Sequence, residues 1–135
     1  MNDTSPSTDE RTWAAAAHLT LLLNLMNICI GLIGSIVVYV LSRNRGPFAR
    51  DQAREALNFQ LTVMLVMVAL LLAVIIVIAQ GPLFMIIGGG RSSLLWLTMA
   101  FVLATLASAA AGVVAAMQAN RGERFRYPFA IRFVR

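Results

Sequence analysis

Several polar side chains of this 135-residue chain lie within or beside long apolar segments, where chemistry or specific contacts could arise. Asn24 and Asn27 fall in the first such segment, and Asn58 and Gln60 enter the second. On a helix with 100° between residues, both asparagines belong to one polar and small-residue stripe. The stripe consists of Thr20, Asn24, Asn27, Gly31, Gly34 and Ser35. It could line a pore or ligand path, but packing against protein with amide hydrogen bonds across the contact is the reading we favour.

No set of residues indicates catalysis or metal binding. His18 is the only histidine, no second ligand stands near it in the sequence, and we expect it at the membrane interface. Cys29 is the only cysteine, which leaves no intramolecular disulfide. Gly88–Gly90 lacks the Lys and Ser/Thr of a phosphate-binding loop. We therefore expect no enzymatic activity, no catalytic residue, no cofactor and no metal.

The elements that must position these side chains are three apolar segments at about residues 14–41, 57–79 and 94–118. None contains Asp, Glu or Arg, and each exceeds the ~20 residues that cross a bilayer core. The composition, 59% hydrophobic and 13% charged, agrees with this. The sequence predicts an all-α integral membrane protein with three transmembrane helices and an interfacial amphipathic helix, Pro47–Gln60, before the second span.

The first segment leaves an alternative open. Its 28 residues are long for one span, so it should tilt or bend, with Gly31 and Gly34 as candidate bend points. It could instead form a re-entrant pair of half-helices. Because each half would be too short to cross, a single span is the favoured reading.

Two tails flank the transmembrane domain, which we place at residues 13–120. Residues 1–12 form an acidic tail that we expect to be disordered. Residues 121–135 form a basic aromatic tail in which Phe125, Tyr127, Phe129, Ile131 and Phe133 would share one side of an extended chain, opposite Arg124, Arg126 and Arg132. We expect this tail to lie along the membrane surface with its aromatic side chains inward.

Charge predicts the topology. Net charge is +5, and with three spans nine of the eleven arginines fall on one side, with Arg11 and Arg91 opposite. The positive-inside rule then places the N-terminus outside and the C-terminus in the cytoplasm of a bacterial inner membrane. Anionic lipids, not nucleic acid, are the expected counter-charge. The candidate lipid contacts are Arg43, Arg45, Arg50, Arg54, Arg124, Arg126 and Arg132.

The third apolar segment carries small residues at every fourth position: Ala104, Ser108, Gly112 and Ala116. Such a stripe lets two helix backbones approach closely. The sequence does not say whether the partner is the same chain, a second copy or another membrane protein.

Three segments together resemble a family of small bacterial membrane proteins of unknown function that is related to the Tic channel component of chloroplast protein import. They are Glu10-Arg-Thr-Trp-Ala with Ala17-His-Leu, Pro47-Phe with the motif Ala53, Arg54, Glu55, Ala56, Leu57, Asn58, Phe59, Gln60, and Asn120-Arg-Gly-Glu with Arg126, Tyr127, Pro128 and Ile131-Arg-Phe. The resemblance covers residues 10–134. The family's acidic pair and following histidine are here Arg50-Asp51 and Gln52, so a titrating histidine at that position is excluded.

That resemblance implies a multi-pass membrane protein with a link to protein translocation or assembly. The leading hypothesis is a non-enzymatic scaffold or accessory subunit of a membrane complex, with the Ala104–Ala116 stripe as its contact face. The alternative is a small oligomeric channel for ions or small solutes, lined by Asn24 and Asn27.

Overall fold

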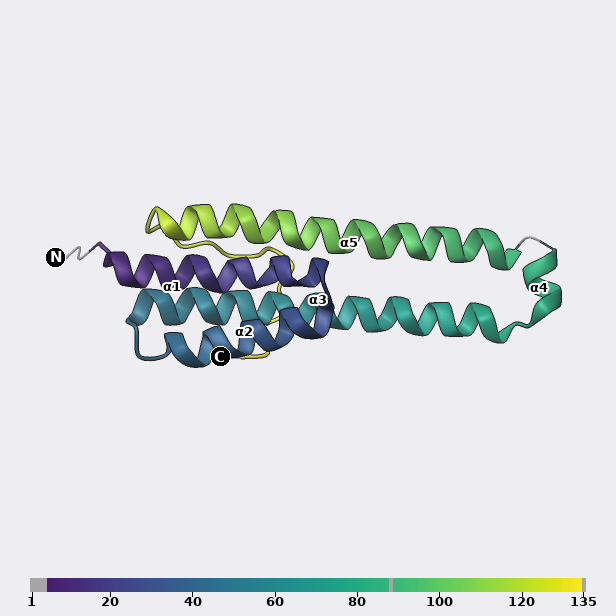
Figure 1. Cartoon of the computed structure of the whole chain (residues 1–135), viewed down its shortest axis with the longest axis horizontal. Helices are drawn as coiled ribbons and strands as arrows, with labels where there is room; N and C mark the ends of the chain where they lie inside the picture. Colours follow the sequence, from purple (N-terminus) through teal and green to yellow (C-terminus); the bar gives the residue numbers. More distant parts are fainter. Residues whose placement is uncertain (1–4, 88, 135) are drawn as a thin grey trace.

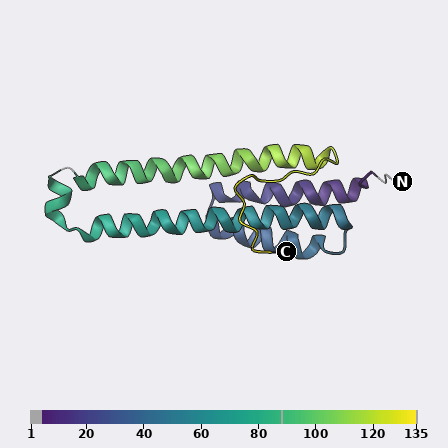
Figure 2. The same ribbon diagram turned by 180° about the vertical axis from the view of Figure 1, so that it is seen from behind.

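The computed structural model describes residues 5–87 and 89–134, and these form helices and connecting segments without a strand. The elements are α1 (Thr8–Leu19), the 3-10 helix η1 (Thr20–Leu25), α2 (Ile28–Ser42), α3 (Pro47–Ala79), α4 (Pro82–Ile86) and α5 (Gly89–Asn120). The two long helices α3 and α5 run side by side, and α4 joins them at one end (Figure 1). The antiparallel hairpin of α1 and α2 packs against their other half, as the view from behind also shows (Figure 2). The all-α prediction is confirmed for these residues.

Local sequence signals account for most helix ends. Ser7 and Glu10 form a reciprocal capping box at the start of α1. Pro47 opens α3 at the position where its missing N–H costs nothing, directly after Gly46, whose φ is 111°. Gly81 and Pro82 end α3 and begin α4, as their sequence predicts. The 33 residues of α3 continue from the predicted amphipathic segment into the apolar one without a break.

The prediction of a single helix over residues 14–41 is wrong. After Leu19 the α-helix changes to the 3-10 helix η1, and the chain reverses its direction at Met26 and Asn27. Asn27 adopts an extended backbone (φ −166°, ψ 137°), and its side-chain oxygen accepts the backbone N–H of Cys29 at 2.8 Å. This is an N-cap, which begins a new helix in the middle of an apolar segment. The structure therefore has the pair of half-helices that the alternative describes, and their re-entry into a membrane stays a prediction.

The two predicted bend points are not where the chain turns. Gly31 lies inside α2, where a Cβ atom would overlap the side-chain oxygen of Asn24 and approach Gln60 Nε2 to 3.0 Å. Its small size allows α2 to pack closely against η1 and α3.

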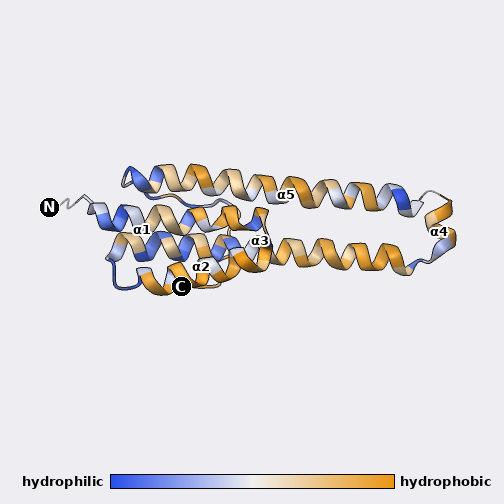
Figure 3. Cartoon of the chain, viewed as in Figure 1, coloured by the Kyte–Doolittle hydropathy of each residue, from blue (hydrophilic) through white to orange (hydrophobic). Residues whose placement is uncertain are grey.

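Two helices of the described residues, α3 and α5, are long and apolar enough to cross a membrane, judged by length and composition. The 15-residue α2 is apolar but, at 1.5 Å per residue, too short to span. Figure 3 shows hydrophobic residues along the outer halves of α3 and α5 and polar residues gathered where the hairpin packs. The predicted count of three spans is not confirmed.

The hairpin brings the start of α1 to the loop that precedes α3. Arg45 lies 3.8 Å from the Asp9 carboxylate, and Glu10 accepts the backbone N–H of Phe48 at 3.3 Å. The start of α1 and the loop before α3 therefore lie at the same end of the bundle, which does not agree with their predicted placement on opposite sides of a membrane.

Candidate functional site

Residues 52–60 of α3, which include the motif Ala53 to Gln60, are the most buried stretch of the described residues. Gln52, Glu55, Asn58 and Gln60 are each at most 7% exposed. Three of them, at positions 52, 55 and 58, recur every third residue and so share one face of α3. The α1–α2 hairpin and the C-terminal tail cover this part of the predicted amphipathic helix Pro47–Gln60, whose placement at the membrane interface stays a prediction.

Four side chains on that face hold the C-terminal tail, and we call Gln52, Glu55, Asn58 and Thr62 the tail clamp. Their partners are backbone groups of the tail: Gln52 Oε1 accepts from Phe125 N at 3.1 Å, Glu55 Oε1 from Tyr127 N at 3.0 Å, Thr62 Oγ1 from Ile131 N at 2.9 Å, and Asn58 Oδ1 from Val134 N at 2.7 Å. The Asn58 amide also donates to the carbonyl of Val134 at 3.0 Å. Because the tail lacks helix and strand, these side chains satisfy backbone groups that would otherwise be buried unpaired.

His18 connects the hairpin to the clamp. The ring is fully buried, with Nδ1 3.0 Å from the Tyr127 hydroxyl and Nε2 3.1 Å from Gln52 Oε1. We assign the neutral Nε2–H tautomer, because Gln52 Oε1 can only accept and the Tyr127 hydroxyl can then donate to Nδ1. Burial, only partly opposed by the hydrogen bond to Gln52, lowers the pKa of His18 to about 4. The prediction of an interfacial histidine is wrong.

Because the first segment folds into a hairpin, residues of its predicted polar stripe meet each other across the two arms. Thr20 and Ser35, one from each arm of the hairpin, have hydroxyls 2.7 Å apart. Asn24 and Gln60 exchange two amide hydrogen bonds, at 3.1 and 2.8 Å. Asn27 is exposed, and its side chain caps the start of α2. Asn24 and Asn27 nevertheless both line a cavity of about 240 Å³ beside Met67 and Phe101, and a path lined by these two residues stays a prediction.

Aromatic rings anchor the first part of the tail. Tyr127 stacks on Phe59 of α3 with ring centroids 3.9 Å apart, and Phe125 meets Tyr127 edge-on at 4.8 Å. The predicted alternation then ends at a turn through Pro128 and Phe129, and the Phe129 side chain is 83% exposed. These rings thus hold the tail against α3 as far as Tyr127, and the placement of the tail along a membrane surface stays a prediction.

Most of the small-residue stripe on α5 packs within the chain. A Cβ atom on Gly112 would lie 2.8 Å from the His18 carbonyl and from Leu21 Cβ. Ser108 and Ala116 are also buried, whereas Ala104 is half-buried. The close approach is made with α1 and η1, so this part of the stripe is covered by the protein itself.

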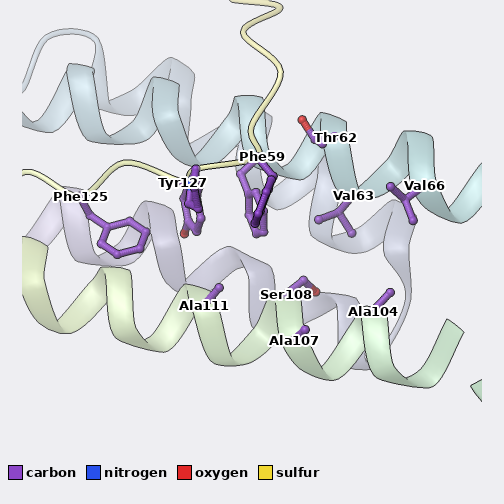
Figure 4. Close-up of a pocket in the computed structure, with 12 residues that line it drawn as sticks. Phe59, Thr62, Val63, Val66, Ala104, Ala107, Ser108, Ala111, Phe125 and Tyr127 are labelled. Carbon is purple, nitrogen blue, oxygen red and sulfur yellow. The ribbon is translucent and has the colours of Figure 1, made fainter. Parts of the chain in front are cut away.

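An apolar cavity of about 390 Å³ lies between α3, α5 and the tail (Figure 4). Its walls include Val63 and Val66 of α3 and Ala104 and Ala107 of α5, which face each other across it. No sequence pattern indicates this cavity, because part of its lining comes from the tail, whose position depends on long-range contacts.

The predicted lipid-contacting arginines lie at the clamped end of the bundle, on or near the elements of the hairpin and tail. Six of them are exposed and Arg54 is half-buried: the exposed ones are Arg43, Arg45, Arg50, Arg124, Arg126 and Arg132. Arg45 also lies over the Trp13 ring, 4.9 Å from its centroid.

Glu10 accepts hydrogen bonds from backbone N–H groups, which stabilise its ionised form. The pKa of Glu10 is lowered, mainly by the backbone N–H of Ser7 that its carboxylate accepts. Within residues 5–87 and 89–134, no three His, Cys, Asp or Glu side chains gather in a way that could hold a metal ion. The site's evident chemistry is hydrogen bonding that fixes the tail.

The sequence was also compared with known proteins. The family model described as the magnetosome magnetite crystal formation protein family, MamF/MmsF, matches residues 9–134. No curated protein and no solved structure matches. The resemblance to a Tic-related family is therefore wrong, because the match over almost the whole chain is to a different family and shows no import link. The chain belongs to the MamF/MmsF family of magnetosome magnetite crystal formation proteins.

Proposed function

We propose that this protein is a non-enzymatic component of the magnetosome membrane that supports magnetite crystal formation by organising the membrane and its other proteins. The observation that carries the proposal is the family match over residues 9–134, together with two helices that are apolar enough to span. These two findings support a membrane position for the protein.

The topology that we propose has two spans, α3 and α5, with both termini in the cytoplasm. The α1–α2 hairpin enters and leaves from the cytoplasmic side. The arrangement of charge supports this: among the described arginines, all except Arg91 belong to the hairpin, the loop after α2, the start of α3 or the segment after α5. The positive-inside rule assigns such an end to the cytoplasm, and α4 then lies at the opposite face.

The distribution of acidic residues favours an indirect role. Residues 80–93, which form the α4 end, contain no Asp or Glu. Carboxylate oxygens are the ligands that hard metal ions prefer, so this end offers little to gather iron. We place the contribution of the protein in contacts with anionic lipids and with another membrane protein or a second copy. The exposed apolar faces of α2, α3 and α5 are the surfaces left for such contacts.

The test is rescue of crystal formation in a magnetite-forming cell that lacks its own members of this family. The full chain should restore crystal size, measured by electron microscopy, and Asn58→Leu should restore it poorly because the tail is released. Thr105→Val is the matched control, since the Thr105 hydroxyl bonds only its own helix at Phe101. Crystals of equal size with the full chain and with an empty vector would contradict the proposal.

A further inference from the structure

The polar side chains that line the cavity between α3, α5 and the tail are hydrogen-bonded within the protein, which leaves little for a polar ligand to bind. Thr62 donates to the Asn58 carbonyl at 2.9 Å while accepting from the tail, and Ser108 donates to the Thr105 carbonyl at 2.8 Å. The Tyr127 hydroxyl is engaged with His18. The hydroxyl protons of the lining are therefore used within the protein, and the rest of the lining is apolar, so an apolar occupant is favoured.

The cavity also opens toward the surroundings of the bundle. Val66, Ala107 and Phe129 belong to its lining and are exposed. Both long walls come from the two candidate spans, inside their apolar segments. Lipid chains, not water, are then the medium next to the opening. At about 390 Å³ the cavity lies within the ~300–1,000 Å³ range of small-molecule sites.

The tail carries positive charge next to lining residues in the sequence. Arg126 lies between two lining residues, Phe125 and Tyr127, and Arg124 directly precedes them; both arginines are exposed. Phe125 and Tyr127 line the cavity, and the arginines that alternate with them are outside its lining and exposed. An amphipathic molecule with an apolar chain and an anionic head would satisfy both surfaces at once.

We propose that this cavity is a specific site for an anionic phospholipid, with one acyl chain between α3 and α5 and the head-group phosphate at Arg124 and Arg126. The small side chains Ala104 and Ala107 make room for the acyl chain. The site rests on the membrane placement proposed above and does not depend on a role in crystal formation.

The experiment uses the full chain in nanodiscs of phosphatidylcholine that contain a trace of phosphatidylglycerol with a photoactivatable acyl chain. Crosslinked positions are mapped by mass spectrometry. Labels should concentrate at residues 63–66 and 104–111. Ala107→Phe should lower this labelling several-fold by filling the cavity. Ala110→Phe should leave it unchanged, because Ala110 is exposed on α5 outside the lining.

The pattern with the unchanged chain decides the proposal even where a variant does not fold. Labels spread evenly around α3 and α5, and insensitive to Ala107→Phe, would show ordinary surrounding lipid and overturn the site. Labels that reach neither helix would overturn the membrane placement itself. Val66→Phe repeats the filling test from the opposite wall.

Competition with unlabelled molecules tests the head group. Phosphatidylglycerol should displace the probe better than phosphatidylcholine, and the double variant Arg124→Gln with Arg126→Gln should remove that preference. Equal competition by both lipids would overturn the assignment of the head group. Displacement by inorganic phosphate alone would show that the arginines bind free phosphate and not lipid.

Discussion

The two halves of this molecule differ in what is buried and what is exposed. The clamped half contains α1, η1, α2, the tail and α3 up to Met67, and its interior is rich in hydrogen-bonded polar side chains. The bare half contains the remainder of α3, α4 and the start of α5, where Leu71 and Ile76 are 58% and 60% exposed. On α3 no residue after Met67 is buried.

The contrast indicates that the two halves are stabilised in different ways and are suited to different surroundings. Directional hydrogen bonds specify one arrangement of the clamped half, because an unpaired buried amide or hydroxyl is costly. The bare half has apolar side chains on its outer surface, which suits surrounding lipid. Variants in the two halves should therefore differ sharply in their effect on stability.

The largest expected effect comes from Gly112→Leu. The side chain would overlap the His18 carbonyl and Leu21, so the hairpin should be displaced and stability should fall by about 3 kcal/mol or more. Thermal unfolding in nanodiscs measures this. Ala110→Leu, at an exposed position of the same helix, is the control and should change little. Equal unfolding temperatures for the two variants would contradict the packing of α5 against α1.

Asn58→Leu should release the end of the tail. It removes the partner of both the N–H and the carbonyl of Val134, which should cost about 2–3 kcal/mol. Trypsin should then cleave after Arg126 and Arg132 faster than in the unchanged chain, and Thr105→Val should not change the cleavage rate. A tail that is cut equally fast in all three proteins would show that the clamp does not hold it.

Acid should weaken the clamped half through His18. The pKa of His18 in the folded protein, about 4, lies below its ordinary value of 6.5. The unfolded chain therefore binds more protons between these values, and stability falls as pH drops from about 6.5 toward 4. The loss should be about 2 kcal/mol by about pH 5. His18→Gln should remove this component of the pH dependence in urea or thermal unfolding, and a variant with the same pH profile as the unchanged chain would refute the assignment.

The smallest expected effect belongs to the bare half. Ile76→Ala should change the unfolding free energy by less than about 0.5 kcal/mol, because its side chain faces outward. Met67→Ala, at the last buried position of α3, should cost about 2 kcal/mol by leaving a cavity. If Ile76→Ala is the more damaging of the two, an unrecognised contact covers the bare half.

Sequence reasoning succeeded where the signal is local. Pro47 after Gly46, and Gly81 before Pro82, mark helix boundaries through backbone preferences of the residues themselves. The break at Asn27 was missed because apolar residues continue on both sides of it, and hydropathy does not register a cap.

The site could be predicted only in part. His18 shares a face with Ala14, Ala17 and Leu21, a spacing that indicates a buried side of α1 and could have corrected its placement. The tail clamp joins side chains to backbone groups 69–76 residues away. No period in the sequence marks such pairs, since the tail presents N–H groups that every residue except proline carries.

The α1–α2 hairpin is the central claim, and side-specific labelling tests it most directly. Single cysteines at Ser7, Asn44, Glu123 and Ser92, in a chain with Cys29→Ala, would be exposed to a membrane-impermeant maleimide in vesicles of known orientation. The hairpin predicts labelling of Ser7→Cys, Asn44→Cys and Glu123→Cys from one side and of Ser92→Cys from the other. Labelling of Ser7→Cys from the same side as Ser92→Cys would show that the first apolar segment crosses the membrane, and would contradict this account.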